Sequence, residues 1–173
     1  MLKDFEDEFT QYRLIGQKAL AQMPDESLNG VIGSGNNSVV VIVRHLGGNL
    51  VSRFTDFLTT DGEKPWRDRD AEFEQRNYTR AEMLEWWDKG WRVLNSELTK
   101  LTDADLGKKI TIRGQQFTVH EALARSVTHV SYHVGQIVIL ARIVKGDDWK
   151  WISVPRGKSK EYNLNPTKEK KPE

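Results

Sequence analysis

Histidine spacing is the first feature of this sequence that points to chemistry. The chain contains four histidines, and His129 and His133 lie four residues apart. In a helix this spacing puts both imidazoles on one face, about one turn apart. Two histidines of one helix share a zinc ion at this spacing. Val130 follows the first histidine, so the glutamate that serves as general base in zinc metalloproteases is absent.

The other two histidines differ in their surroundings. His45 lies in an apolar segment, and the glycine pair shortly after it admits another backbone or a ligand. His120 lies nine residues before His129, so at about 100° per residue it points to the opposite side of the helix and is expected at the surface. His45 and the helical pair are therefore either three metal ligands or hydrogen-bonded core residues.

A polar stripe follows His45 within its apolar segment. Asn49, Arg53 and Asp56 recur at helical steps, and buried polar groups need partners. Asn49 and Asp56 could orient a ligand histidine or a substrate, and Arg53 could hold an anion. Alternatively, Arg53 and Asp56 pair with each other or with the loop that follows. In that loop, Glu63 is the candidate general base.

Hydrophobic periodicity predicts the helices that must position these residues. Apolar residues at three- and four-residue steps mark residues 1–23, 79–98 and 118–144. The second and third of these segments open with capping boxes, at Thr79 and Thr118. The tryptophans of the middle segment are expected in the core, because aromatic burial contributes strongly to core stability.

One segment is ambiguous by pattern alone. Residues 39–43 are β-branched and fit either a buried strand or the start of a helix. We favour a helix, since the apolar pattern continues to Leu58 for about six turns. Residues 60–78 are expected to form an ordered, charged loop anchored by Trp66 and Phe73.

These elements together predict an all-α fold. Residues 110–119 alternate around Arg-Gly and predict a small β-hairpin before the last helix. Four long helices with connections of unequal length predict a four-helix bundle over residues 1–155. Residues 156–173 are expected to form a tail that is partly disordered.

Composition excludes several classes of protein. The chain has 173 residues, close to the roughly 100–200 of one domain, and no cysteine, which excludes disulfides and thiolate ligands. A net charge of +1 argues against nucleic acid as the main partner. The longest apolar run is residues 39–43, and the acidic N-terminus has no signal-peptide pattern, so a cytoplasmic protein without a membrane span is expected.

Two segments resemble the DinB/YfiT superfamily of small metal-binding four-helix proteins. They are Arg44-His45-Leu46-Gly47-Gly48-Asn49 and the run from Thr128 to Ile137, which is similar to the His-x3-His-x-Gly-Gln helix of that superfamily. Residues 52–67 look like an uncharacterised bacterial branch of it. The resemblance covers about residues 1–155 and implies an up-down-down-up bundle whose metal ligands are His45, His129 and His133.

The resemblance also implies a class of activity. Characterised relatives include thiol S-transferases and a thiol-dependent isomerase, which use low-molecular-weight bacterial thiols. Three neutral imidazoles suit zinc or nickel and leave an open coordination position, where water or an external thiol is activated. A metal-dependent hydrolase or thiol S-transferase acting on a small molecule is therefore expected, and a homodimer is common in the superfamily. The alternative is a non-catalytic, stress-linked protein that binds a metal or a small ligand. One departure is Val134, where relatives often have arginine.

Overall fold

The computed structural model describes residues 1–166 and is mostly helical. Its helices are α1 (Leu2–Leu20), α2 (Val39–Phe54), α3 (Arg80–Leu98), α4 (Val119–Lys145) and the short α5 (Ser159–Asn163). The strands β1 (Lys109–Ile112) and β2 (Gln115–Thr118) form an antiparallel hairpin. Short 3-10 turns lie in the connections: η1 (Asp25–Ser27), η2 (Ala71–Phe73), η3 (Asp103–Asp105) and η4 (Gly146–Asp148).

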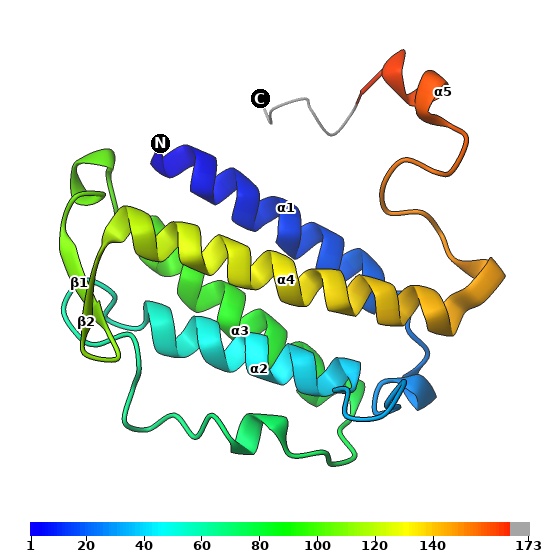
Figure 1. Ribbon diagram of the computed structural model, residues 1–173, viewed down its shortest axis with the longest axis horizontal. Coiled ribbons are helices and arrows are strands. Elements are labelled where there is room, and N and C mark those ends of the chain that lie inside the picture. Colours follow the sequence, from blue (N-terminus) through cyan, green and yellow to red (C-terminus); the bar gives the residue numbers. More distant parts are fainter. Residues whose placement is uncertain (167–173) are drawn as a thin grey trace.

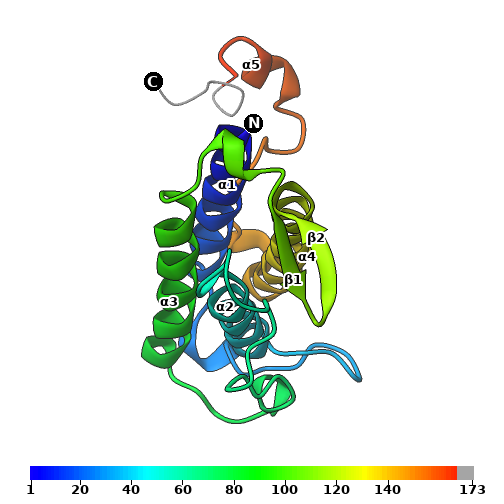
Figure 2. The same ribbon diagram turned by 90° about the vertical axis from the view of Figure 1, so that its left-hand side faces the viewer.

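The four long helices lie side by side (Figures 1 and 2). α2 packs against both α3 and α4, and α1 packs against α4. α1 and α4 run in one direction across Figure 1, whereas α2 and α3 run in the other. The connection from α2 to α3, residues 55–79, therefore has to return along the molecule; we call it the crossover segment. Its turn η2 packs against α2.

Residues 39–43, which fit either a strand or a helix by pattern, form the start of helix α2, as the length of the apolar pattern favoured. The Ser38 side chain caps α2 by accepting a hydrogen bond from the backbone N–H of Val41 at 3.4 Å. All five residues of the β-branched run 39–43 are buried. Because this turn of α2 has no solvent face, its sequence lacks the polar positions that normally distinguish an amphipathic helix from a buried strand.

The end of α2 differs from the prediction. The helix stops at Phe54 instead of continuing to Leu58, because Thr55 is extended and Asp56 adopts a positive φ of 49°. Aspartate tolerates this left-handed conformation better than most residues. The Asp56 carbonyl then accepts hydrogen bonds from the Thr59 and Thr60 hydroxyls, which form a turn. Asp56 is thus exposed and has left the polar stripe of α2.

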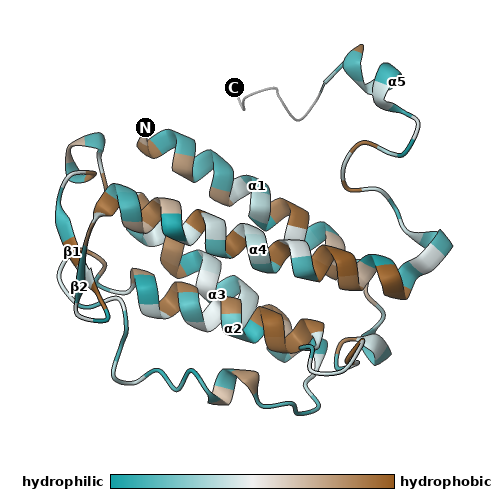
Figure 3. Ribbon diagram, in the orientation of Figure 1, coloured by the Kyte–Doolittle hydropathy of each residue, from teal (hydrophilic) through white to brown (hydrophobic). Residues whose placement is uncertain are grey.

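The predicted capping boxes are confirmed, and so is the core position of two of the three tryptophans of α3, whereas Trp86 is only half-buried. Reciprocal side-chain and backbone hydrogen bonds form at Thr79 with Glu82 and likewise at the start of α4. Trp87 and Trp91 are each 1% exposed, and the Trp87 ring covers Gly16 of α1. Figure 3 shows the apolar residues concentrated along the first half of α2 and the second half of α4.

The predicted hairpin is also confirmed, and it holds the crossover segment. Arg113 and Gly114 both have positive φ values, 52° and 73°, as a type I′ turn requires. The Asp61 carboxylate accepts hydrogen bonds from both of their backbone N–H groups, at 2.8 and 2.9 Å. The Gly62 N–H donates to the Thr111 carbonyl at 2.8 Å. The start of the crossover segment is therefore fastened to the hairpin.

The region after α4 packs only in part. Gly146 ends the helix as predicted, with a φ of 54°, and Trp149 is buried. Trp151 lies under the Arg142 guanidinium, 4.5 Å from its ring centroid. The tail predicted to be partly disordered, residues 156–173, contains the short helix α5. Its last part, residues 167–173, lies outside the described residues.

One helix has the length and composition of a membrane span. The most apolar window within Val119–Asp148 has a mean hydropathy of 1.2. This helix also carries three histidines, and it packs against α1 and α2. The core helix of a soluble protein meets the same criterion of length and composition, so that criterion alone does not identify a span.

Two glycines set the close approach of α2 and α3. A Cβ on Gly47 would lie 2.4 Å from the backbone carbonyl oxygen of Trp86, and one on Gly90 would lie 2.9 Å from the Gly47 Cα. A methyl group at either position requires the helices to separate, because the opposing atoms belong to backbone.

We expect Gly47→Ala to lower the free energy of unfolding by about 1–3 kcal/mol through overpacking. Gly107→Ala is the matched control, since no heavy atom lies within 4 Å of the Cβ position there. Its effect is expected to stay within about 0.5 kcal/mol. Urea denaturation of both variants makes the comparison, and equal stabilities would show that the α2–α3 contact does not depend on Gly47.

Candidate metal centre

Three histidines from two helices converge in this structure. His45 of α2 meets His129 and His133 of α4, and one ring nitrogen from each lies within 4.8 Å of the others. The Nε2 atoms of His45 and His129 are 3.4 Å apart. The four-residue spacing on α4 and the packing of α2 on α4 produce this geometry. The three residues singled out from the sequence are therefore brought together.

His120 does not join the cluster. It lies in the first turn of α4, is exposed, and makes an edge contact with Phe5 of α1 at 5.3 Å between ring centroids. This confirms the prediction that the fourth histidine is a surface residue.

A buried carboxylate completes the surroundings of His45. Glu72, in η2 of the crossover segment, is 7% exposed, and its Oε2 lies 2.9 Å from Nδ1 of His45. The neighbouring Phe73 ring packs on the imidazole, with centroids 4.6 Å apart. Phe73 is thus an anchor of the loop as predicted, whereas Trp66 is 58% exposed and is not.

Sequence reasoning missed Glu72, although one signal for it was present. A Cβ on Gly48 would lie 2.2 Å from the Glu72 Oε1, so this glycine makes room for the carboxylate. Its neighbour Gly47 makes room for the α3 backbone. The glycine pair beside His45 indicated a close approach, but not which segment approaches.

Arg67 supports the carboxylate from the other side. Its Nε donates a hydrogen bond to Oε1 of Glu72 and its Nη2 donates one to Oε2, both at 2.8 Å, which is the bidentate geometry of a strong ion pair. Burial disfavours ionisation of Glu72, but hydrogen bonds from His45 and Arg67 outweigh it and hold the pKa of Glu72 below its ordinary value. Glu72 therefore stays ionised and accepts a hydrogen bond from Nδ1–H of His45.

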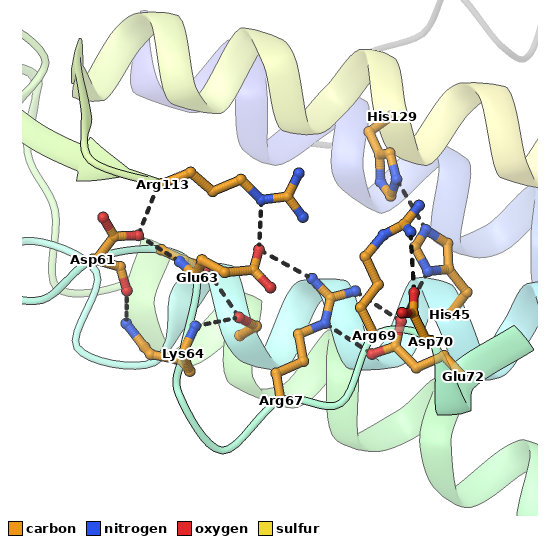
Figure 4. Close-up of polar contacts among 12 residues, drawn as sticks. His45, Asp61, Glu63, Lys64, Arg67, Arg69, Asp70, Glu72, Arg113 and His129 are labelled. Carbon is orange, nitrogen blue, oxygen red and sulfur yellow. Dashed lines mark hydrogen bonds and ion pairs between the residues drawn. The ribbon is translucent and has the colours of Figure 1, made fainter.

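A series of ion pairs continues from this site to the hairpin (Figure 4). Arg67 lies 3.8 Å from Oε2 of Glu63, and the same oxygen accepts a hydrogen bond from Nε of Arg113 at 3.0 Å. Glu63, the candidate general base, is thus held between two arginines. It has no direct contact with the histidines among the contacts of residues 1–166.

His129 and His133, the two cluster histidines of α4, differ in how their second nitrogen is satisfied. Nδ1 of His133 lies 2.9 Å from the Gln136 amide oxygen and donates a hydrogen bond to it, which leaves Nε2 with a free lone pair. Nδ1 of His129 is buried and has no partner among the described residues. Two of the three imidazoles, those of His45 and His133, are therefore fixed in the tautomer that presents Nε2 to the centre of the cluster.

Burial keeps His129 and His133 uncharged. It lowers the pKa of His129 to about 3, and the neighbouring His133, His45 and two arginines add to the effect. Burial also lowers the pKa of His133 to about 4, although the hydrogen bond to Gln136 opposes it. Neutral imidazoles with available lone pairs are the form that binds a metal ion.

The remaining candidates lie at different distances from the cluster. Asn49 is half-buried one turn after His45, and Arg53 is buried a further turn along α2. Neither makes a hydrogen bond or ion pair within residues 1–166, so the alternative pairing of Arg53 with Asp56 is not observed. Asp56 lies outside the helix and is exposed.

Fold and site together define a helical protein with a partly buried three-histidine cluster that can hold a metal ion. The sequence model of DUF1572, described as "Protein of unknown function (DUF1572)", matches residues 1–158. The chain therefore belongs to the DUF1572 family. Among curated proteins, none matches the sequence. The family carries no assigned activity, so the function has to be argued from the site.

The metal-free protein should lose stability as pH falls from about 6.5, the ordinary pKa of histidine, toward about 4, the lowered pKa of His133 in the folded protein. In this window the unfolded chain binds protons at His129 and His133 while the folded chain does not, so stability rises with pH. His129→Gln should flatten the dependence, measured as the urea midpoint across the window, and His120→Gln is the control. If the urea midpoint of His129→Gln depended on pH as steeply as that of wild type, the lowered pKa of His129 would be contradicted.

Proposed function

We propose that this protein is a metal-dependent enzyme of the DinB/YfiT type. In this proposal the four long helices form an up-down-down-up bundle, and one zinc or nickel ion is held by His45, His129 and His133. The opposite directions of the helix pairs α1/α4 and α2/α3 support the bundle (Figure 1). The meeting of the three imidazoles supports the ion.

The observation that carries the proposal is the donor set. It consists of three imidazole nitrogens, and two of the rings are oriented by hydrogen bonds to Glu72 and Gln136. An acceptor on the outer nitrogen is the usual support of a metal-binding histidine. Nδ1 of His129 is buried and unpartnered among the described residues, so the polar contact of this ring is the one between its Nε2 and Nε2 of His45, inside the cluster. Nitrogen ligands suit zinc or nickel better than calcium or magnesium.

Three protein ligands are typical of catalytic rather than structural metal sites, because they leave a coordination position for a reactant. A divalent ion there would supply Lewis acidity, which lowers the pKa of a bound water or thiol. The chain's own groups prepare for this: Glu72 and Gln136 hold the imidazoles, and burial keeps those of α4 neutral. Asn49 and Arg53 lie on the α2 side of the cluster, where they would contact a substrate.

The reaction class we propose is hydrolysis, or transfer of an external low-molecular-weight thiol to a small electrophile. The chain has no cysteine, so a thiol would have to come from outside. Glu63 is engaged by Arg67 and Arg113, so a role as general base would require its release from both. We assign no catalytic role to Asp56, which is exposed beyond the end of α2.

The remaining parts of the proposal concern partners and location. We propose a cytoplasmic protein, with small molecules rather than nucleic acid or a membrane as partners, that forms a homodimer. The balanced charge supports the proposal that nucleic acid is not a partner, because nucleic-acid binding normally needs a basic surface. A non-catalytic metal-binding or small-ligand-binding stress protein is the second candidate, and it is favoured if a metal-loaded protein turns over no thiol or ester substrate.

Metal content tests the proposal directly. Protein purified without a histidine tag should contain about one zinc or nickel ion per chain by plasma mass spectrometry. His129→Ala should lose the ion, whereas His120→Ala should retain it. Wild-type protein without metal, even after incubation with zinc and with nickel, would overturn the proposal.

Glu72→Gln tests the support of His45. It keeps the shape of the side chain but removes the charge that holds the Nδ1 proton, so metal affinity should fall about 10–100-fold. Competition with a chromogenic chelator measures this change. Glu74→Gln, an exposed glutamate two residues away, is the control. Equal affinities in the two variants would show that Glu72 serves only to anchor the loop.

A further inference from the structure

Arg53 is a buried cation without a partner. Its side chain is 8% exposed, and its Nη1 is fully enclosed with no hydrogen bond to any residue in 1–166. No described carboxylate lies within ion-pair distance of it. Burying a charge is costly unless an opposite charge or a set of acceptors compensates it. The structure therefore retains an arginine in a position that its own residues do not satisfy.

The place of Arg53 connects it to the histidine cluster. It lies eight residues after His45 on α2, which is two turns or about 12 Å along the axis. A Cβ on Gly62 would lie 2.6 Å from its Nη1, so the guanidinium rests on the start of the crossover segment. Its charge contributes to the lowered pKa of His129, which puts the guanidinium within electrostatic range of the cluster.

Other polar groups between Arg53 and the histidines also lack partners. Asn49 lies one turn before Arg53 on α2, and Ser126 lies three residues before His129 on α4 and is 6% exposed. Neither side chain hydrogen bonds to another residue of the described chain. Buried polar groups are normally satisfied within the protein, by water or by a ligand. By helical spacing, Asn49 falls on the side of α2 that carries His45, and Ser126 falls on the side of α4 that carries His129.

Charge around this position is positive. Burial lowers the pKa of Arg53, Glu63 opposes this, and the nearby Arg67, Arg113 and Arg125 lower the pKa further. The Asp61 carboxylate is also within electrostatic range of Arg53. Arg67 and Arg113 are already paired with glutamates. Arg125, one turn before His129, makes no ion pair and lies over the Phe117 ring. The site thus has an excess of cations even before a metal ion is bound.

We propose that Arg53 binds an anionic oxygen group of the substrate, a carboxylate or a phosphoryl group, beside the three-histidine cluster. This inference rests on the proposed function for the role of the cluster, but the anion site itself does not require a metal. Asn49 and Ser126 donate the further hydrogen bonds that such a group accepts. The substrate is then a small molecule with an anionic end at Arg53 and its reacting group at the histidines.

The test uses the full-length, metal-free protein, so that the probes do not bind a metal ion. Inorganic phosphate and acetate are titrated separately by calorimetry into wild type, Arg53→Met and Arg92→Met. Arg92 is an exposed arginine of α3 without an ion pair among residues 1–166, which makes it the matched control. We expect one of the probes to bind wild type and Arg92→Met equally, and about tenfold or more weaker to Arg53→Met. The preferred probe distinguishes a phosphoryl from a carboxylate ligand.

A second measurement separates a ligand site from a structural role. Without any anion, Arg53→Met should raise the thermal midpoint, because the aliphatic stem is kept and an uncompensated buried charge is removed. A lowered midpoint, or equal binding of the probes by wild type and Arg53→Met, would overturn the inference, as would wild type that binds neither probe. Metal content is measured in parallel. Probe binding that depends on Arg53 in a protein without metal affinity would keep the anion site and reject the proposed function.

Discussion

The hydrogen bond between Nδ1 of His45 and the Glu72 carboxylate is the interaction on which the site depends. A buried carboxylate is stable only with strong compensation, and Arg67 supplies it through two hydrogen bonds. The same contact fixes the imidazole and fastens the middle of the crossover segment to α2. Because Glu72 occupies the space left by Gly48, even the backbone of α2 is adapted to it.

This contact explains why the crossover segment is ordered over its length. Its first part is bound to the hairpin turn through Asp61, and Glu63 and Arg67 link that turn to Glu72 (Figure 4). Long loops in compact domains are usually functional or packed. Here the connection forced by the parallel course of α2 and α3 also supplies the groups that orient a histidine. Topology and site geometry are thus determined by the same segment.

Local signals were sufficient to predict much of the structure. Capping boxes, the hairpin turn and helical spacing gave the elements, and the His129/His133 spacing gave two members of the cluster. The third member, His45, needed the packing of α2 on α4, which the pattern of residues 39–43 did not specify. Glu72 and Arg67 lie in a segment without periodicity, so nothing in their spacing could place them beside His45. The end of α2 at Phe54 was missed because Asp56 accepts a left-handed backbone that its apolar neighbours did not signal.

The distance along the chain between the converging histidines has a mechanical consequence. His45 and His129 are 84 residues apart in sequence, and the chain has no cysteine with which to cross-link itself. An ion shared by these two side chains would close a loop that includes α3, the crossover segment and the hairpin. Closing so long a loop restricts the unfolded chain strongly, much as a disulfide does. Removing the ion would then remove this restriction on the unfolded chain, together with the link that the ion makes between α2 and α4.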